Sequence, residues 1–95
     1  MTILESKNGT EMTLKIVGRL DTTTAPDLEE KINTLDGVTE LFIDCENLEY
    51  ISSAGLRVLL IMKKACDRLS LVGVCPEVRE ILDTTGFSDI LGLDE

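Results

Sequence analysis

The chain contains 95 residues, of which 9 are basic, 18 are acidic and none is histidine, so its formal net charge at pH 7 is −9. This length supports one domain with one modest core, which we expect to span residues 1–95, and a hydrophobic fraction of 43% argues against disorder. Binding to nucleic acid or to an anionic membrane requires a broad basic patch. The only local basic cluster in this sequence is Lys63-Lys64, so both kinds of partner are disfavoured. The absence of histidine removes the commonest general acid–base residue and the commonest zinc ligand. We therefore expect a docking protein that needs no cofactor or metal and is not an enzyme.

The N-terminal residues predict a β-hairpin. Ile3–Ser6 and Met12–Val17 have the composition of strands, and they flank the turn Lys7-Asn8-Gly9-Thr10. Asn-Gly is a strong hairpin signal because both residues tolerate positive φ angles. Apolar and polar side chains alternate in the second strand, so we expect one of its faces to be buried. We expect Gly18-Arg19-Leu20-Asp21 to leave this strand as a loop.

The next segment predicts a helix. Thr22-Thr23-Thr24-Ala25-Pro26 is a helix-start signal, with a threonine cap and a proline in the first turn. Apolar side chains follow at helical spacing, and Asp36-Gly37 ends the pattern. The residues expected to face the core are Ala25, Leu28, Ile32 and Leu35.

A second strand and helix follow. Leu41-Phe42-Ile43 is a continuous apolar run, as expected for a strand buried on both faces, and a loop over Asp44–Ile51 leads from it to Ser52-Ser53. The helical pattern then continues to Arg68 with apolar side chains on two faces, which predicts a largely buried helix. One face contains Val58, Ile61, Met62, Ala65 and Leu69, and the other contains Leu59, Leu60 and Cys66.

The C-terminal part predicts a strand over Leu69–Val74 and a helix that begins at Pro76 and ends at Gly86. The side chains of this helix expected to face the core are Val78, Ile81, Leu82 and Thr85. Beyond it, a short strand or an irregular tail is expected to cap the core with Phe87, Ile90, Leu91 and Leu93.

This order of elements predicts an α/β fold with a mixed β-sheet, in which an N-terminal hairpin is joined to a parallel portion and about three main helices pack on the sheet. In such sheets, sites form in the loops that leave the carboxyl ends of strands. The loops around Asp21 and Ser52-Ser53 both lie at such ends and lead into helices, so we expect the function to reside there.

Processing and redox features indicate a cytoplasmic protein. The N-terminus has no basic segment followed by an apolar stretch, so no secretory signal is expected, and no apolar run approaches the roughly 20 residues that span a bilayer. Cys45, Cys66 and Cys75 are odd in number and form no CxxC pair. Their apolar neighbours indicate small buried side chains in a reducing compartment.

The two serines at the start of the second helix, Ser52 and Ser53, have two compatible roles. Serine is a preferred N-cap, and Gly55 lets the turn pack closely. The free N–H groups and the dipole at the same place favour an anion, so a phosphoryl group on one of the serines is held well there. One serine can cap the helix while its neighbour points outward.

Two other interpretations have weaker support. A serine hydrolase lacks both the GxSxG elbow and a histidine base, and a Ser-Lys dyad would need Lys63 or Lys64 to reach back from the middle of the helix to its start. Asp21, Asp44 and Glu46 are candidates for a divalent-cation site at one end of the sheet, although charged loop residues are mostly solvated.

The residues around the serines also carry a family resemblance. Tyr50-Ile51-Ser52-Ser53-Ala54-Gly55-Leu56-Arg57-Val58-Leu59 resembles the signature of STAS domains, the sulfate-transporter and anti-sigma-factor-antagonist family. The resemblance covers nearly the whole chain in the same order, although the C-terminus is somewhat short for the family. The further similar segments are Gly18-Arg19-Leu20-Asp21 with Thr24-Ala25, Leu41-Phe42-Ile43-Asp44, Val74-Cys75-Pro76-Glu77-Val78 and Thr85-Gly86-Phe87.

The resemblance implies an anti-sigma factor antagonist that acts by partner switching. Ser53 takes the acceptor position of the family's Asp-Ser-Ser/Thr-Gly-Leu pattern, while Ser52 stands where the family has aspartate and is the alternative acceptor. The unphosphorylated form would bind a serine-kinase anti-sigma factor and so free a sigma factor. Phosphorylation of Ser53 would release the kinase, and a metal-dependent serine phosphatase would reset the protein. The implied partner-binding residues are Asp21, Thr22, Thr23, Ser52, Ser53, Ala54, Gly55 and Arg57.

The alternative is a STAS subunit that is not phosphorylated and serves as an interaction or ligand-sensing part of a signalling or transport complex. In that case Ser52-Ser53 acts only as a cap. The free protein is expected to be a monomer.

Overall fold

The computed structural model describes residues 1–87, apart from the side chain of Thr34, and it confirms the predicted α/β class with a mixed sheet. The sheet has five strands. They are β1 (Thr2–Asn8), β2 (Glu11–Leu20), β3 (Glu40–Asp44), β4 (Leu48–Ile51) and β5 (Arg68–Val72). The helical elements are α1 (Ala25–Glu30), the 3-10 turn η1 (Lys31–Thr34), α2 (Ser53–Ala65) and α3 (Pro76–Thr85).

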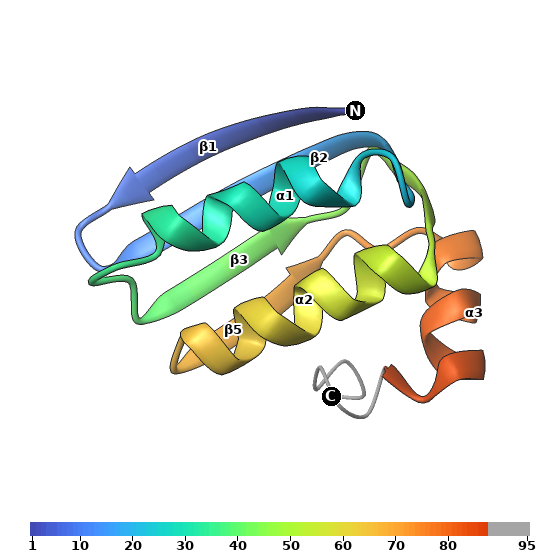
Figure 1. Ribbon diagram of the computed structural model, residues 1–95. Helices are drawn as coiled ribbons and strands as arrows, with labels where there is room; N and C mark the ends of the chain where they lie inside the picture. The colour runs from blue at the N-terminus through green and yellow to red at the C-terminus, as the bar shows by residue number, and fades with distance from the viewer. Residues whose placement is uncertain (88–95) are drawn as a thin grey trace.

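The sheet joins an antiparallel hairpin to a parallel portion. β1 and β2 are antiparallel, and Gly9 takes a φ of 65° in the turn between them, as the Asn-Gly signal predicts. β3 pairs parallel to β2, and β5 pairs parallel to β3, which gives the order β1-β2-β3-β5 (Figure 1). The parallel crossovers run through α1 and α2, so both helices begin near the carboxyl ends of strands.

The predicted loop over Gly18–Asp21 is wrong in its first three residues, because Gly18, Arg19 and Leu20 continue β2. They pair there with β4, a strand inside the segment Asp44–Ile51 that was expected to be a loop. The register shifts between Gly18 and Arg19, and Gly18 has a φ of 104° that favours glycine. This irregularity lets β2 pair with β3 along its first half and with β4 at its end.

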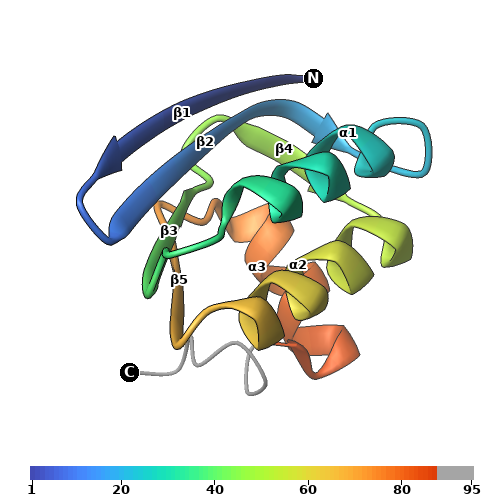
Figure 2. The same ribbon diagram turned by 60° about the vertical axis from the view of Figure 1, so that its left-hand side comes forward.

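The hydrophobic core lies between one face of the sheet and the helices. In Figure 2 the three helices lie on the same side of β3 and β5. Leu41 and Ile43 are therefore buried, whereas Phe42, which points to the other face, is only half-buried. The expectation that this strand is buried on both faces is thus wrong for Phe42, because the described helices cover one face only.

The predicted helices exist, but α1 ends at Glu30, and the chain continues to Thr34 as the 3-10 turn η1 and not as the single helix expected up to Asp36. The helix α2 and the strand β5 also end earlier than predicted. α2 ends at Ala65, since Cys66 adopts an extended backbone and leads directly into β5. β5 ends at Val72, and Gly73 then turns the chain with a φ of 66°. α3 ends at Gly86, as predicted, with the left-handed φ of 81° that glycine adopts at helix C-termini.

Three side chains expected in the core are exposed: Ile61 and Ala65 on α2, and Thr85 on α3. The buried side chains of α2 form one stripe at helical spacing, and Ile61 and Ala65 lie outside it. Thr85 instead donates a 2.8 Å hydrogen bond from its hydroxyl to the carbonyl of Ile81. The buried residues of α2 are Gly55, Leu56, Val58, Leu59 and Met62.

The cysteines are free thiols. Cys45 and Cys66 are buried, as expected, while Cys75 is half-buried and donates a hydrogen bond to the carbonyl of Leu48 at 3.4 Å. Burial raises the pKa of Cys45 to about 12, and it also raises the pKa of Cys66. Neither buried thiol is therefore ionised near neutral pH.

Phe87 is half-buried against the core, as expected for a capping residue. The predicted capping residues Ile90, Leu91 and Leu93 lie outside the described part of the chain. Within residues 1–87, no helix has both the length and the apolar character needed to cross a membrane.

Candidate functional site

The ends of β2 and β4 bring the two candidate loops together. The backbone N–H of Ser52 donates to the carbonyl of Leu20 at 2.9 Å, so the start of α2 lies against the loop that leads into α1. Both loops leave carboxyl ends of parallel strands, as predicted, and both lead into helices.

Asp21 holds the loop between β2 and α1 in one conformation. Its Oδ1 accepts hydrogen bonds from the hydroxyl of Thr23 at 2.7 Å and from the N–H groups of Thr23 and Thr24 at 3.0 and 3.2 Å. The hydroxyl and N–H donors favour the charged carboxylate, so they lower the pKa of Asp21 below its ordinary value. The carboxylate of Asp21 thus holds the loop in place through these three hydrogen bonds.

The hydroxyl of Thr24 does not cap α1, although Thr24 occupies the N-cap position that the sequence predicts. It donates to the carbonyl of Arg19 at 2.9 Å and accepts from the N–H of Asp21 at 2.8 Å. Thr24 therefore ties the loop back to β2. Pro26 lies in the first turn of the helix, as expected.

An aromatic contact links the ends of β2 and β4. The guanidinium of Arg19 lies 4.4 Å from the centroid of the Tyr50 ring, a distance typical of a cation–π interaction. The same guanidinium is 3.8 Å from the carboxylate of Asp21. Arg19 thus joins both sides of the site.

The two serines differ in their contacts. Ser52 is the N-cap of α2, with an extended backbone, and its Oγ accepts a hydrogen bond from the N–H of Gly55 at 3.3 Å. Ser53 is the first residue of the helix and its side chain is exposed. The predicted division between one capping serine and one outward-facing serine is present in the fold.

Gly55 allows the helix to approach the sheet closely. A Cβ at this position would lie 2.7 Å from Cγ of Leu20 and 3.0 Å from Cγ1 of Ile51, which is shorter than carbon atoms normally approach. Gly55 is buried, so it sets the depth at which α2 begins and keeps Ser53 at the surface.

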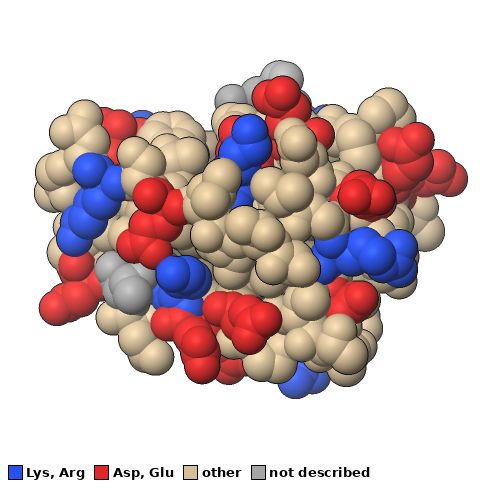
Figure 3. Space-filling model, turned by 90° about the horizontal axis from the view of Figure 1, so that it is seen from above, with Lys and Arg blue, Asp and Glu red and all other residues tan. Residues whose placement is uncertain are grey.

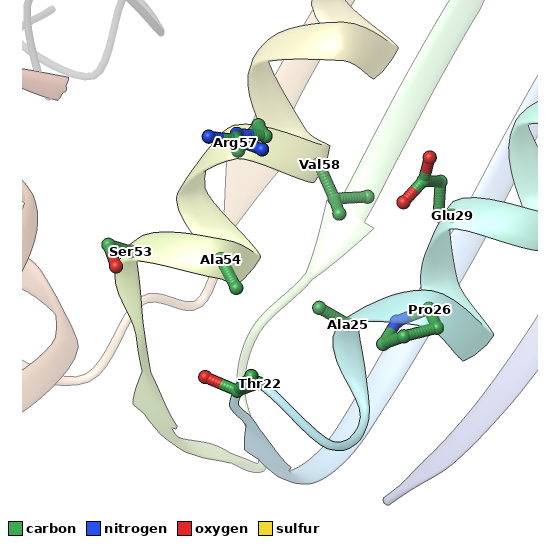
Figure 4. A pocket seen from close by; sticks show the side chains of 8 residues that line it. All are labelled: Thr22, Ala25, Pro26, Glu29, Ser53, Ala54, Arg57 and Val58. Carbon is green, nitrogen blue, oxygen red and sulfur yellow. The ribbon is translucent and has the colours of Figure 1, made fainter.

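A groove of about 310 Å³ opens between α1 and α2 at this end of the molecule. Figure 4 shows Ala54 and Val58 directed toward α1, Ser53 directed away from α1 at the start of the helix, and Arg57 on the face of α2 turned to the viewer. The lining residues are Thr22, Ala25, Pro26, Glu29, Ser53, Ala54, Arg57 and Val58. Within residues 1–87, the guanidinium of Arg57 makes no ion pair.

The geometry gives little support to the Ser-Lys dyad or to the divalent-cation site. Lys63 lies ten residues beyond Ser53 on a continuous helix, a separation of about 15 Å, and Lys64 lies farther still. Among the described residues, no three acidic or thiol side chains cluster as a cation site would require. Asp44 instead accepts a 3.0 Å hydrogen bond from the N–H of Glu46.

Surface charge is dispersed on the face seen in Figure 3. There, basic side chains stand among acidic ones and form no continuous basic patch. This distribution agrees with a chain whose acidic residues outnumber its basic residues by 18 to 9.

Comparison with known proteins identifies the family. A sequence model of the STAS domain matches residues 2–95. The chain belongs to the STAS domain family. The resemblance noted in the sequence is therefore confirmed.

Individual relatives of this STAS domain share much of its length. The anti-sigma-B factor antagonist of Staphylococcus aureus (strain NCTC 8325 / PS 47) is 30% identical over 88 residues, which cover 86% of this chain and 82% of the relative. The crystal structure of an anti-sigma factor antagonist from Mycobacterium paratuberculosis matches with a TM-score of 0.83 and 26% identity, over 94% of this chain and 80% of the other. The Bacillus cell fate determinant SpoIIAA in its phosphorylated form shares the fold, with a TM-score of 0.71 and 18% identity over 96% of this chain and 86% of that chain.

The STAS fold brings most of the predicted partner-binding residues to one surface. Of the eight, Thr22, Ser53, Ala54 and Arg57 line the groove, and Thr23 is exposed in the adjoining loop. Asp21 and Ser52 are half-buried and hold the two loops in place, while Gly55 is buried beneath the surface. A buried glycine positions the surface without presenting a side chain to a partner.

The sequence analysis missed four residues of the groove: Ala25, Pro26, Glu29 and Val58. Ala25 and Glu29 are one helical turn apart on α1, and Ala54 and Val58 are one turn apart on α2. This spacing was visible in the sequence. What the sequence did not reveal is that α1 and α2 lie side by side.

Proposed function

We propose that this STAS domain is an anti-sigma factor antagonist that acts by partner switching. In its unphosphorylated form it binds an anti-sigma factor that is also a serine kinase, and a sigma factor is freed. Phosphorylation of Ser53 ends this interaction. The names of two relatives at 30% and 26% identity support the antagonist role.

The exposure of Ser53 at the first position of α2 is the observation that carries the proposal. Its neighbour Ser52 uses its oxygen to cap the helix, whereas the side chain of Ser53 is exposed and lines an open groove. A kinase can therefore reach the Ser53 hydroxyl without unwinding the helix. The free N–H groups of the first turn then lie beside the new phosphate and stabilise its charge.

The chemistry of the transfer belongs to the partner. The kinase supplies ATP, the Oγ of Ser53 forms a bond to the γ-phosphorus, and ADP leaves. The hydroxyl proton passes to a base on the kinase, a role that an aspartate of the catalytic loop has in protein kinases. A metal-dependent serine phosphatase later hydrolyses the phosphoester, which restores the Ser53 hydroxyl and the binding-competent form.

Release follows from where the new charge is placed. A phosphoserine carries about −1.5 to −2 charges near neutral pH. On Ser53 this charge lies inside the contact surface, beside Thr22 and Ala54. Docking then requires a solvated dianion to be buried, and acidic groups of the partner are repelled.

Mass spectrometry after incubation with ATP tests the acceptor. A serine-kinase anti-sigma factor from the same genome should add one phosphoryl group to the wild-type protein. Ser53→Ala should abolish the addition, and the matched variant Ser52→Ala should retain it. Phosphate on the Ser53→Ala variant, or none on wild-type protein with any such kinase of the genome, would contradict the proposal.

A second function is favoured by one feature of the sequence. Ser52 stands where antagonists of the family carry aspartate, which suits a STAS subunit that binds partners without being phosphorylated. In that case Ser53→Asp should leave partner affinity nearly unchanged. The switch instead predicts a loss of tenfold or more, which corresponds to about 1.4 kcal/mol.

A further inference from the structure

The groove beside Ser53 continues along the helices. A second groove of about 450 Å³ shares Pro26 and Glu29 with the first and extends it toward the carboxyl end of α2. Together they form a continuous α1–α2 furrow. Beyond the Ser53 groove, the furrow is lined by Glu30, Ile32, Asn33 and Ile61.

The furrow contains an exposed aliphatic side chain. Ile61 lies in the middle of α2, where apolar spacing predicts burial, yet 36% of its surface is exposed. Ile32 lines the furrow beside it and is only partly buried. The residues between 1 and 87 cover this pair only in part, so some of its apolar surface is left for another molecule.

Acidic side chains line the α1 side of the furrow. Glu29 and Glu30 are exposed, and their carboxylates make no ion pair or hydrogen bond within residues 1–87. The next residue, Lys31, differs from them because its ammonium forms an ion pair with the carboxylate of Glu5 on β1 at 2.9 Å. The two unpaired carboxylates thus face the furrow with their charge uncompensated.

We propose that the α1–α2 furrow binds a segment of the anti-sigma factor in which an aliphatic side chain is flanked by lysine or arginine. The aliphatic group would cover Ile61 and Ile32, and the cations would pair with Glu29 and Glu30. This inference rests on the proposed function, and it extends the contact surface from Ser53 along α2. Ser53 then lies at one end of the bound segment, where a phosphate disrupts docking while the rest of the furrow is unchanged.

Charge reversal tests the furrow. The double variant Glu29→Lys/Glu30→Lys should weaken binding to a purified serine-kinase anti-sigma factor of the same genome at least tenfold, measured by isothermal titration calorimetry. Ile61→Ser should weaken it about fivefold to tenfold, because less apolar area is covered. The matched control is Glu77→Lys/Glu80→Lys on α3, which lines a different groove and should change the dissociation constant less than twofold.

Salt dependence and folding separate the possible causes. Affinity should fall with added salt for the wild type and fall less steeply for the Glu29→Lys/Glu30→Lys variant, since two ion pairs are lost. Urea unfolding should show that the furrow and control variants are as stable as the wild type. Ile61 is exposed, so a folded Ile61→Ser protein is expected.

Three results would overturn the inference. If the furrow variants bind as tightly as the wild type while Ser53 is still phosphorylated, the furrow is not the docking surface and the proposed function stands. If Ile61→Ser alters the sedimentation mass of the free protein instead of its affinity, the occupant is a second copy. A wild-type protein that binds no anti-sigma factor contradicts the proposed function itself.

Discussion

The two adjacent serines at the start of α2 differ in what their hydroxyl groups contact. The Oγ of Ser52 accepts the Gly55 N–H, while the side chain of Ser53 is exposed. Serine-Serine before an apolar helix predicts a cap, and it predicts that one of the pair is exposed. Which serine does which depends on the residue at which the helix begins, and the backbone of β4 determines that residue.

Single alanine substitutions should separate the two roles. Ser52→Ala removes the cap and should lower the free energy of unfolding by about 1 kcal/mol. Ser53→Ala removes an exposed hydroxyl and should change the free energy of unfolding by less than about 0.5 kcal/mol. Urea denaturation of both variants measures the difference, and equal destabilisation would show that the cap is assigned to the wrong serine.

Gly55→Ala should destabilise the fold despite the higher helix propensity of alanine. Alanine gains up to about 1 kcal/mol in a helix, but its Cβ would lie 2.7 Å from the side chain of Leu20, and such overpacking costs about 1–3 kcal/mol. We expect a net loss of up to about 2 kcal/mol in urea denaturation when the full helix-propensity gain is subtracted from the overpacking cost. Lys64→Ala, on the exposed side of α2, is the control and should be nearly neutral. A Gly55→Ala protein more stable than the wild type would contradict the close approach.

At the scale of secondary structure, the elements with a clear local pattern could be predicted from the sequence, whereas a strand that depends on distant pairing could not. The hairpin, α1, β3, α2, β5 and α3 all follow from local patterns. β4 was missed because its four residues follow a charged stretch and resemble a loop. Its strand character comes from pairing with Gly18–Leu20, some thirty positions earlier in the sequence. The same long-range pairing explains why Gly18–Leu20 form a strand and not the predicted loop.

The loop between β2 and α1 should make folding stability depend on pH. Hydrogen bonds hold the pKa of Asp21 below its ordinary value of 3.8, so the folded state favours the carboxylate. This contribution is fully present above about pH 4, the unfolded-state pKa, and is lost as the pH falls through the lower folded-state pKa. Asp21→Ala should therefore cost stability at pH 7 and progressively less in acid.

Urea unfolding of the wild type and Asp21→Ala from pH 7 to about pH 3 measures this linkage. The control is Asp36→Ala, which removes a carboxylate from an exposed turn. This change should not alter the pH dependence of the free energy of unfolding in the same way. A stability difference between the wild type and Asp21→Ala that is constant with pH, or that grows in acid, would contradict the account of the loop.

At the scale of the whole molecule, the net charge of −9 excludes some partners but does not explain a switch. Phosphorylation would bring the total to about −11, so both states are strongly acidic. What changes is the charge at one end of the α1–α2 furrow. The furrow itself could not be derived from the sequence, because apolar spacing assigned Ile61 to the core. In the fold, Ile61 lies outside the buried stripe of α2.

The central claim is that phosphate on Ser53 abolishes docking, and it is tested most directly by comparing two forms of one protein. Phosphoserine can be incorporated at position 53 during synthesis, which makes the comparison independent of any kinase. In calorimetry against the anti-sigma factor, the dissociation constant of the phosphorylated form should be at least tenfold larger than that of the unphosphorylated wild type. Equal affinities of the two forms would contradict partner switching at Ser53.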